Sequence, residues 1–197
     1  IRDSNASLAN SAVEGASLIP ATGEPPISGE VLERLLILYA NAREAIGRNA
    51  HRFDTTLLEA LIDAAPVDAL VGLADDALRS ELGKLEAALN SSSIGSPRYT
   101  LELQPANDQR PAALLSHRRH MGEELTQVLP LSSFETGELR AVRDVAAQLY
   151  GLVREGAQIQ RGTRSQEVSS FAQAQAWLLE EAKKGRQIQR FKGLGEM

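Results

Sequence analysis

Histidine and carboxylate side chains are the groups in this sequence that could transfer protons or bind a metal ion. Cysteine is absent, which excludes thiol chemistry and cysteine-based metal sites. The stretch SHRRH carries His117 and His120 on a predicted strand. Because the two residues are an odd number of positions apart, their rings point to opposite faces of that strand and cannot hold one ion. We interpret both as solvated strand residues.

The carboxylates lie on predicted helix faces and do not form converging pairs. Asp75-Asp76 opens a predicted helix, where the helix dipole favours negative charge. Glu180-Glu181 precedes Lys183-Lys184, which we interpret as i,i+4 surface pairing. A Mg²⁺ site in a nucleic-acid enzyme needs converging carboxylates, for example from a D-x-D turn, and none occurs. The motifs H-E-x-x-H, G-x-S-x-G and G-x-x-x-x-G-K-[ST] are also missing. The sequence therefore predicts no catalytic residue, no metal site and no cofactor of its own.

Basic side chains near the end of the chain are the strongest candidates for binding nucleic-acid phosphates. Two glycines follow them, and we expect a loop there whose backbone N–H groups could approach an anion closely. A helix that ends in positive charge is equally well explained by its dipole, so this alternative stays open. The candidates are Lys183, Lys184, Arg186, Arg190 and Lys192, the weaker pair Arg118 and Arg119 in a predicted hairpin, and the loop glycines Gly193 and Gly195.

Composition and charge limit the partners that this chain can have. The hydrophobic content of 43% predicts a folded core, and the net charge of −5 is unevenly distributed. Residues 1–105 carry 8 Lys and Arg against 15 Asp and Glu, whereas residues 106–197 carry 13 against 11. Nucleic-acid contacts are therefore expected from the second half. The absence of cysteine fits a reducing, cytoplasmic setting, which we expect for this chain. No membrane partner is expected, since no apolar run approaches the roughly 20 residues of a membrane helix.

Hydrophobic periodicity predicts the elements that must position these groups. Residues 1–26 are expected to form a weak hairpin around Leu8 and Leu18, with Glu14-Gly15 between them. Three consecutive strands in 98–129 are expected to form an antiparallel meander, and short extended pieces are expected near Ile159 and Val168. Helices are expected at 28–47, 54–65, 75–89, 132–156 and from Ser170 to Lys184, followed by a strand at 186–192. Asp54 is expected at the start of the second of these helices, and Ser170 with Gln173 is expected to form a capping box at the start of the last.

These elements predict an α+β fold, with a helical bundle and an antiparallel sheet flanked by helices. We expect three segments: 1–96 as the hairpin and helical half, 97–185 as the sheet-and-helix half, and 186–197 as a separate strand and glycine loop. The tyrosines Tyr39, Tyr99 and Tyr150 lie in apolar patterns and are expected in the core.

The C-terminal sequence resembles a known family. IQRFKGLGEM, residues 188–197, is similar to a signature of the B subunit of bacterial DNA gyrase and its topoisomerase IV relatives. The preceding residues from Val168 resemble the helix-then-strand unit by which that subunit re-enters its Toprim domain. Upstream, ISGEVLERLLILYANA and ETGELRAVRDVAAQLYGL resemble the large insertion of Gram-negative-type gyrase B subunits.

The resemblance implies that the chain is an excised piece of an ATP-dependent type IIA topoisomerase, which negatively supercoils DNA by double-strand passage. Because the family's metal-binding E-G-D-S-A and D-x-D motifs are absent here, Mg²⁺ and ATP are expected only in the parent protein. Its partners would be DNA, the gyrase A subunit in an A2B2 heterotetramer, and the rest of the B subunit. The piece itself is expected to be an architectural insertion that couples the engagement of DNA and the A subunit to ATP turnover.

Two other classes of protein remain as alternatives. A free-standing helical adaptor that binds protein partners, without DNA contact, would expose a broad apolar stripe on residues 31–46. An independent metal-dependent nuclease would need carboxylates that converge in the fold.

Overall fold

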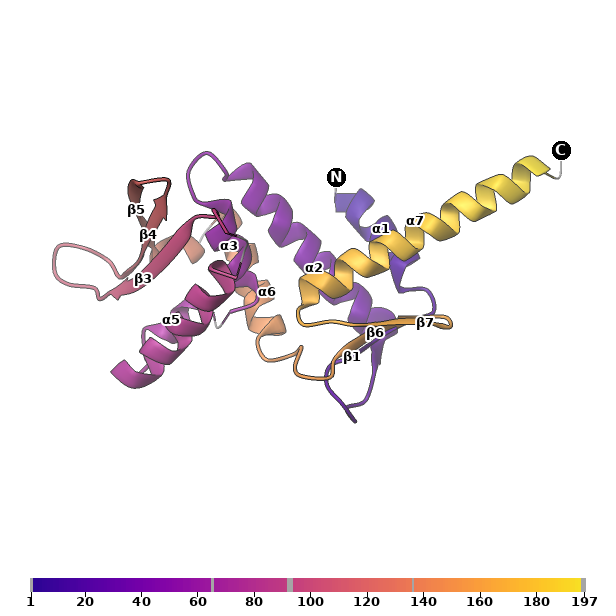
Figure 1. Cartoon of the computed structure of the whole chain (residues 1–197), viewed down its shortest axis with the longest axis horizontal. Coiled ribbons are helices and arrows are strands. Elements are labelled where there is room, and N and C mark those ends of the chain that lie inside the picture. The colour runs from indigo at the N-terminus through magenta and orange to yellow at the C-terminus, as the bar shows by residue number, and fades with distance from the viewer. Residues whose placement is uncertain (1, 65, 92–93, 136, 196–197) are drawn as a thin grey trace. The chain divides into compact units, whose positions relative to one another are not determined.

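The computed structural model describes residues 2–64, 66–91, 94–135 and 137–195. The chain forms two compact units (Figure 1): the first unit comprises Ile1–Asn41 with Gly151–Met197, and the second unit is Ala42–Tyr150. These units do not coincide with the expected sequential segments 1–96, 97–185 and 186–197. The reason is a strand pairing between residues about 140 positions apart, which joins the two ends of the chain into one unit.

The sheet of the first unit is antiparallel, with the strand order β2-β1-β6-β7. Its strands are β1 (Ala16–Ile19), β2 (Ile27–Ser28), β6 (Gln158–Arg161) and β7 (Arg164–Glu167). Leu18 of β1 pairs with Ile159 of β6, and both side chains are fully buried. The expected extended pieces near Ile159 and Val168 are thus the β6–β7 hairpin, and their pairing with β1 completes the sheet.

Two helices, α1 (Arg2–Val13) and α7 (Phe171–Gly195), pack against each other in the first unit. The start of α7 follows the expected capping box: Ser170 Oγ accepts from Gln173 N at 3.2 Å, and Gln173 Oε1 accepts from Ser169 N at 2.9 Å. Phe171 is buried and lies 5.5 Å, between ring centroids, from Tyr39 of α2 (Gly29–Arg48). These contacts place the first turns of α7 in the core of the unit.

The hairpin expected within residues 1–26 is wrong for its first strand, because residues 2–13 form α1. Ala9 and Ala12 are buried at helical spacing, and Ala is the best helix-forming residue. Arg161 of β6 caps the C-terminal end of this helix, since its guanidinium donates to Ser11 O at 3.4 Å and to Glu14 O at 3.3 Å. Helix propensity and a contact from the distant strand β6 therefore both stabilise α1.

The second unit contains the expected meander, with the strand order β3-β4-β5. The strands are β3 (Arg98–Gln104), β4 (Ala113–His120) and β5 (Glu123–Pro130). Met121 and Gly122 form the turn between β4 and β5 with φ values of 50° and 83°, as a tight hairpin turn requires. The register pairs Tyr99 with Arg118 and Arg118 with Leu125.

Helices cover this meander in the second unit. The helix α3 (Thr55–Ile62) packs against α5 (Asp75–Leu89) and α6 (Arg140–Leu149), and α5 packs against β3. The short helix α4 (Val67–Leu70) lies between α3 and α5 in the sequence. Asp54 caps α3, because its Oδ1 accepts from Thr56 N at 2.9 Å. The predicted α+β class, and the helices expected at 54–65 and 75–89, are confirmed.

The helix expected over residues 132–156 is shorter than predicted. Two 3₁₀ turns, η1 (Leu131–Phe134) and η2 (Gly137–Leu139), precede α6, which ends at Leu149. Gly137 has a φ of 67°, a left-handed conformation that interrupts a right-handed helix. Tyr150 follows the helix and is 49% exposed, so its expected place in the core is wrong, whereas Tyr39 and Tyr99 are buried. No helix in the described ranges combines the length and the apolarity needed to cross a membrane.

Candidate nucleic-acid interface

The basic segment at the end of the chain is helical. The expected strand at 186–192 and the expected loop at Gly193 and Gly195 are wrong, since α7 continues to Gly195. None of the described strands pairs with this segment, and a helix satisfies its backbone hydrogen bonds internally. The N–H groups of the two glycines therefore do not form an anion-binding loop. Residues 196 and 197, the end of the signature, lie outside the described residues.

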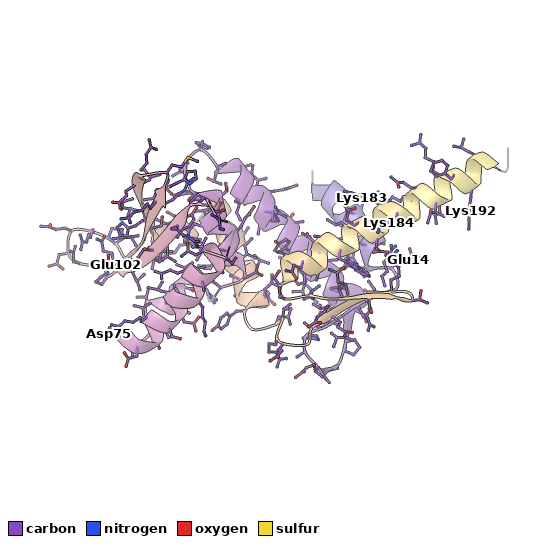
Figure 2. The ribbon with its side chains drawn as sticks, in the orientation of Figure 1. Glu14, Asp75, Glu102, Lys183, Lys184 and Lys192 are labelled. Carbon is purple, nitrogen blue, oxygen red and sulfur yellow. The ribbon has the colours of Figure 1, made fainter. Side chains whose placement is uncertain are left out.

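The first two lysines of this segment lie beside carboxylates of the same helix. Lys183 Nζ is 3.4 Å from Glu180 Oε1, and Lys184 Nζ is 3.4 Å from Glu181 Oε1. Glu181 is buried and also lies 3.4 Å from Arg164 Nε of β7. The expected pairing of these glutamates with these lysines is present, but the spacing is i,i+3 and not the expected i,i+4, and Glu181 is buried. The pairs partly neutralise the two lysines that Figure 2 shows on the middle turns of α7.

The remaining cations of α7 are exposed, and none pairs with a carboxylate in the described part of the chain. These residues are Arg186, Arg190 and Lys192, the last near the C-terminal end of α7 in Figure 2. Lys183, Arg186 and Arg190 are spaced at i, i+3 and i+7, so they share one helix face over roughly 10 Å of its axis. We call these three residues the basic face of α7.

Apolar side chains lie beside the basic face. Ile188, Phe191 and Leu194 are 57%, 75% and 64% exposed. Figure 1 shows the corresponding half of α7 (yellow) extending beyond α1 and the sheet of its own unit. The segment thus presents both cations and apolar groups to solvent.

The second candidate pair is divided between two faces of the meander. Arg119 lies on the open face, where its Nε donates to Glu124 Oε1 at 2.8 Å. His117 lies on the same face, with Nδ1 3.0 Å from Thr126 Oγ1. Adjacent strand residues point to opposite faces, so Arg118 is on the inner side of the meander with Tyr99, its partner in the register.

Arg118 lines a cavity of about 470 Å³ within the second unit, together with Tyr99, Gln127 and residues 50–56. Sequence reasoning missed this cavity. The sequence feature that could have indicated it is the alternation along β4. Leu114 and Ser116 are buried, and Arg118 is the next residue on the same side of this strand. An arginine at an inward strand position needs a polar environment to accept it.

Tyr99 and Asp54 form the polar wall of this cavity. The Tyr99 hydroxyl donates to Asp54 Oδ2 at 2.8 Å. Burial, followed by this hydrogen bond to Asp54, raises the pKa of Tyr99 to about 12. The nearby charge of Arg118 acts in the opposite direction on the same pKa. The tyrosine is therefore a neutral donor at physiological pH and not a nucleophile.

Comparison with known families decides the identity. The sequence model of the family described as "DNA gyrase B subunit insert domain" matches residues 16–182. The chain belongs to this family. The match extends over parts of both units, and it ends one residue before Lys183, where the basic face of α7 begins.

The insert-domain assignment confirms the resemblance seen in the sequence. The two upstream stretches that resemble the gyrase B insertion lie within the matched residues, whereas the signature at 188–197 lies outside them. By its description, this insert domain is part of a DNA gyrase B subunit. Within the described residues, no three His, Asp or Glu side chains gather in a way that could hold a metal ion.

Proposed function

We propose that this insert domain is an architectural element of an ATP-dependent type IIA topoisomerase that negatively supercoils DNA by double-strand passage. Its role is to couple the engagement of DNA and of the gyrase A subunit to ATP turnover. The observation that carries this proposal is the family match over residues 16–182. ATP and Mg²⁺ act elsewhere in the parent protein, and residues 186–197 belong to its Toprim framework.

The basic face of α7 supplies the DNA contact in this proposal. Lys183, Arg186 and Arg190 line one side of the helix, and Lys192 adds a further cation. Each phosphate that a cation neutralises releases counterions, so the affinity for DNA falls as the salt concentration rises. Contacts of this kind fix the position of DNA without reading its sequence. The expected binding is therefore weak, salt-sensitive and indifferent to base sequence.

The acidic helical part of the second unit supplies the protein contact. Its helix α5 begins with the exposed carboxylates Asp75 and Asp76, which repel DNA phosphates. Figure 2 places Asp75 at the start of α5 and Glu102 on β3, two carboxylates of this acidic region. The partners in this proposal are the A subunit within an A2B2 heterotetramer and the rest of the B subunit.

The alternative, a helical adaptor that binds only proteins, receives limited support. The apolar stripe that it requires on residues 31–46 is largely buried: Leu32, Leu36 and Ile46 are each at most 3% exposed. Val31 is exposed at 52%, but one residue is not a docking stripe. The exposed apolar groups at the end of α7 are the observation in favour of an adaptor.

Binding of a short DNA duplex to the 197-residue chain tests the DNA contact by electrophoretic mobility shift at several salt concentrations. We expect weak binding that is strongly reduced in the triple variant Lys183→Gln, Lys184→Gln, Arg186→Gln, which keeps Arg190 and Lys192. In reconstituted gyrase, the same variant should reduce supercoiling and DNA-stimulated ATP hydrolysis together. Tight binding that resists salt, or binding that survives the triple variant, contradicts the proposal.

A further inference from the structure

The cavity beside Arg118 has the size of a small-ligand site. Its volume of about 470 Å³ lies within the roughly 300–1,000 Å³ typical of ligand pockets. Four parts of the second unit form its walls: residues 50–56 up to the start of α3, Leu89 at the end of α5, Ser96 and Pro97 before β3, and the inward side chains of the meander. All of these residues belong to the same compact unit.

The charges around the cavity favour an anion. Arg52 and Arg118 line it, and Asp54 is the carboxylate among its lining residues. Both oxygens of Asp54 are engaged, Oδ1 with Thr56 N at 2.9 Å and Oδ2 with the Tyr99 hydroxyl at 2.8 Å. The Arg52 guanidinium lies 5.3 Å from the centre of the Phe53 ring, a cation–π arrangement that leaves its charge in place. Positive charge is therefore in excess.

Arg118 carries a donor that the protein does not satisfy. Among the described residues, its Nε is buried and has no hydrogen-bond partner. A buried donor on a charged group is costly to leave unpaired. An acceptor that enters the cavity would satisfy this donor.

We propose that this cavity binds a phosphate-type oxyanion, with Arg118 as the principal donor and Arg52 as the second cation. The planar guanidinium matches the geometry of phosphate oxygens, which makes arginine the preferred residue for such groups. The phosphate group could belong to a free ion or to a DNA backbone, and the recognition chemistry is the same. This site is separate from the basic face of α7 and does not depend on the role proposed for that face.

Inorganic phosphate and pyrophosphate are the probes for the free ion, and a short DNA duplex is the probe for the backbone. Binding to the 197-residue chain is measured by calorimetry and by backbone NMR shifts, with chloride at matched ionic strength as the reference. The test variant is Arg118→Met, which keeps the aliphatic stem. Arg118→Lys keeps the charge without the planar fork, and Arg119→Met removes the neighbouring cation on the opposite face as the matched control.

We expect saturable binding of pyrophosphate with Kd about 1 mM or tighter, and NMR shifts in residues 50–56 and 118. Arg118→Met should weaken it at least about tenfold, Arg118→Lys should recover part of the loss, and Arg119→Met should leave it within about twofold. If Arg118→Met also weakens duplex binding, a backbone phosphate occupies the site; if it weakens only the ions, the ligand is a free anion. Either result supports the site.

Three results would overturn the proposal. The first is the lack of saturable binding by any probe to the unaltered chain. The second is an equal loss in Arg118→Met and Arg119→Met, which would indicate surface charge alone. The third is unchanged binding in Arg118→Met. Circular dichroism of each variant without ligand checks that it folds. If Arg118→Met does not fold, the double variant Arg118→Lys, Arg52→Met replaces it, and the same three results would overturn the proposal.

Discussion

The two halves of α7 have the same backbone conformation but different surroundings. In the first half, Phe171, Leu178 and Ala182 are buried within the first unit, and Glu181 is tied to Arg164 of β7. In the second half, from Arg186 to Gly195, every described residue is exposed. Tertiary contacts therefore stabilise the first half, whereas the second depends on helix propensity and on continuity with the first. The packed half supports the exposed half, which is free to contact a partner.

The largest expected difference between the halves is in stability. Phe171→Ala should lower the free energy of unfolding by about 3–5 kcal/mol, because Phe171 is 1% exposed and its removal leaves a cavity. Phe191→Ala should change it by less than about 0.5 kcal/mol, since Phe191 is 75% exposed. Chemical denaturation followed by circular dichroism measures both values. Comparable losses in the two variants would show that the second half is also packed in solution.

DNA binding is expected to depend on the second half of α7 and not on the first half. The double variant Arg186→Gln, Arg190→Gln should weaken duplex binding about tenfold near 0.1 M salt, and should reduce the slope of log K against log salt by roughly 0.9 per lost phosphate contact. Arg164→Gln is the matched control, because this arginine pairs with Glu181 in the packed half. Fluorescence anisotropy with a labelled duplex measures the affinities. If the control weakens binding as much as the double variant, the exposed half is not the contact surface.

Local signals in the sequence were sufficient for elements that carry their own start and packing pattern. The Asp54 cap predicted the start of α3, the Ser170–Gln173 box predicted the start of α7, and alternation predicted the meander. The pairing of β1 with β6 could not be predicted locally, since it joins residues about 140 positions apart. The strand expected at 186–192 was a misinterpretation: Ile188, Phe191 and Leu194 recur every third residue, which fits a helix better than a strand.

The candidate interface could likewise be predicted only in part from local sequence patterns. The basic residues of α7 were identified by type, but their helical geometry, and hence the shared face of Lys183, Arg186 and Arg190, was not. The division of Arg118 from Arg119 follows from strand alternation and could have been stated in advance. The cavity beside Arg118 could not, because residues 50–56 reach it only through the tertiary fold.

A smaller effect is expected at the start of the packed half. Ser170→Ala removes the hydroxyl that accepts from Gln173 N, and should lower the free energy of unfolding by about 1 kcal/mol. Ser170→Asp keeps an acceptor and adds a favourable charge at the helix N-terminus, so its stability should equal or exceed that of the unaltered chain. Thermal and urea unfolding measure both variants. A neutral Ser170→Ala would mean that packing alone fixes the start of α7.

The smallest effect separates the observed helix from the strand and loop first expected at the end of the chain. Gly193 lies within α7, and a methyl group at this position would meet nothing within 4 Å. Gly193→Ala should therefore favour the helix by about 0.5–1 kcal/mol, seen as stronger ellipticity at 222 nm and helical Cα shifts for 186–195. In a glycine loop with positive φ, the same change would introduce strain and weaken local order. A fall in helicity would thus support a loop at these residues. It would also support the prediction that the N–H groups of Gly193 and Gly195 are available to an anion.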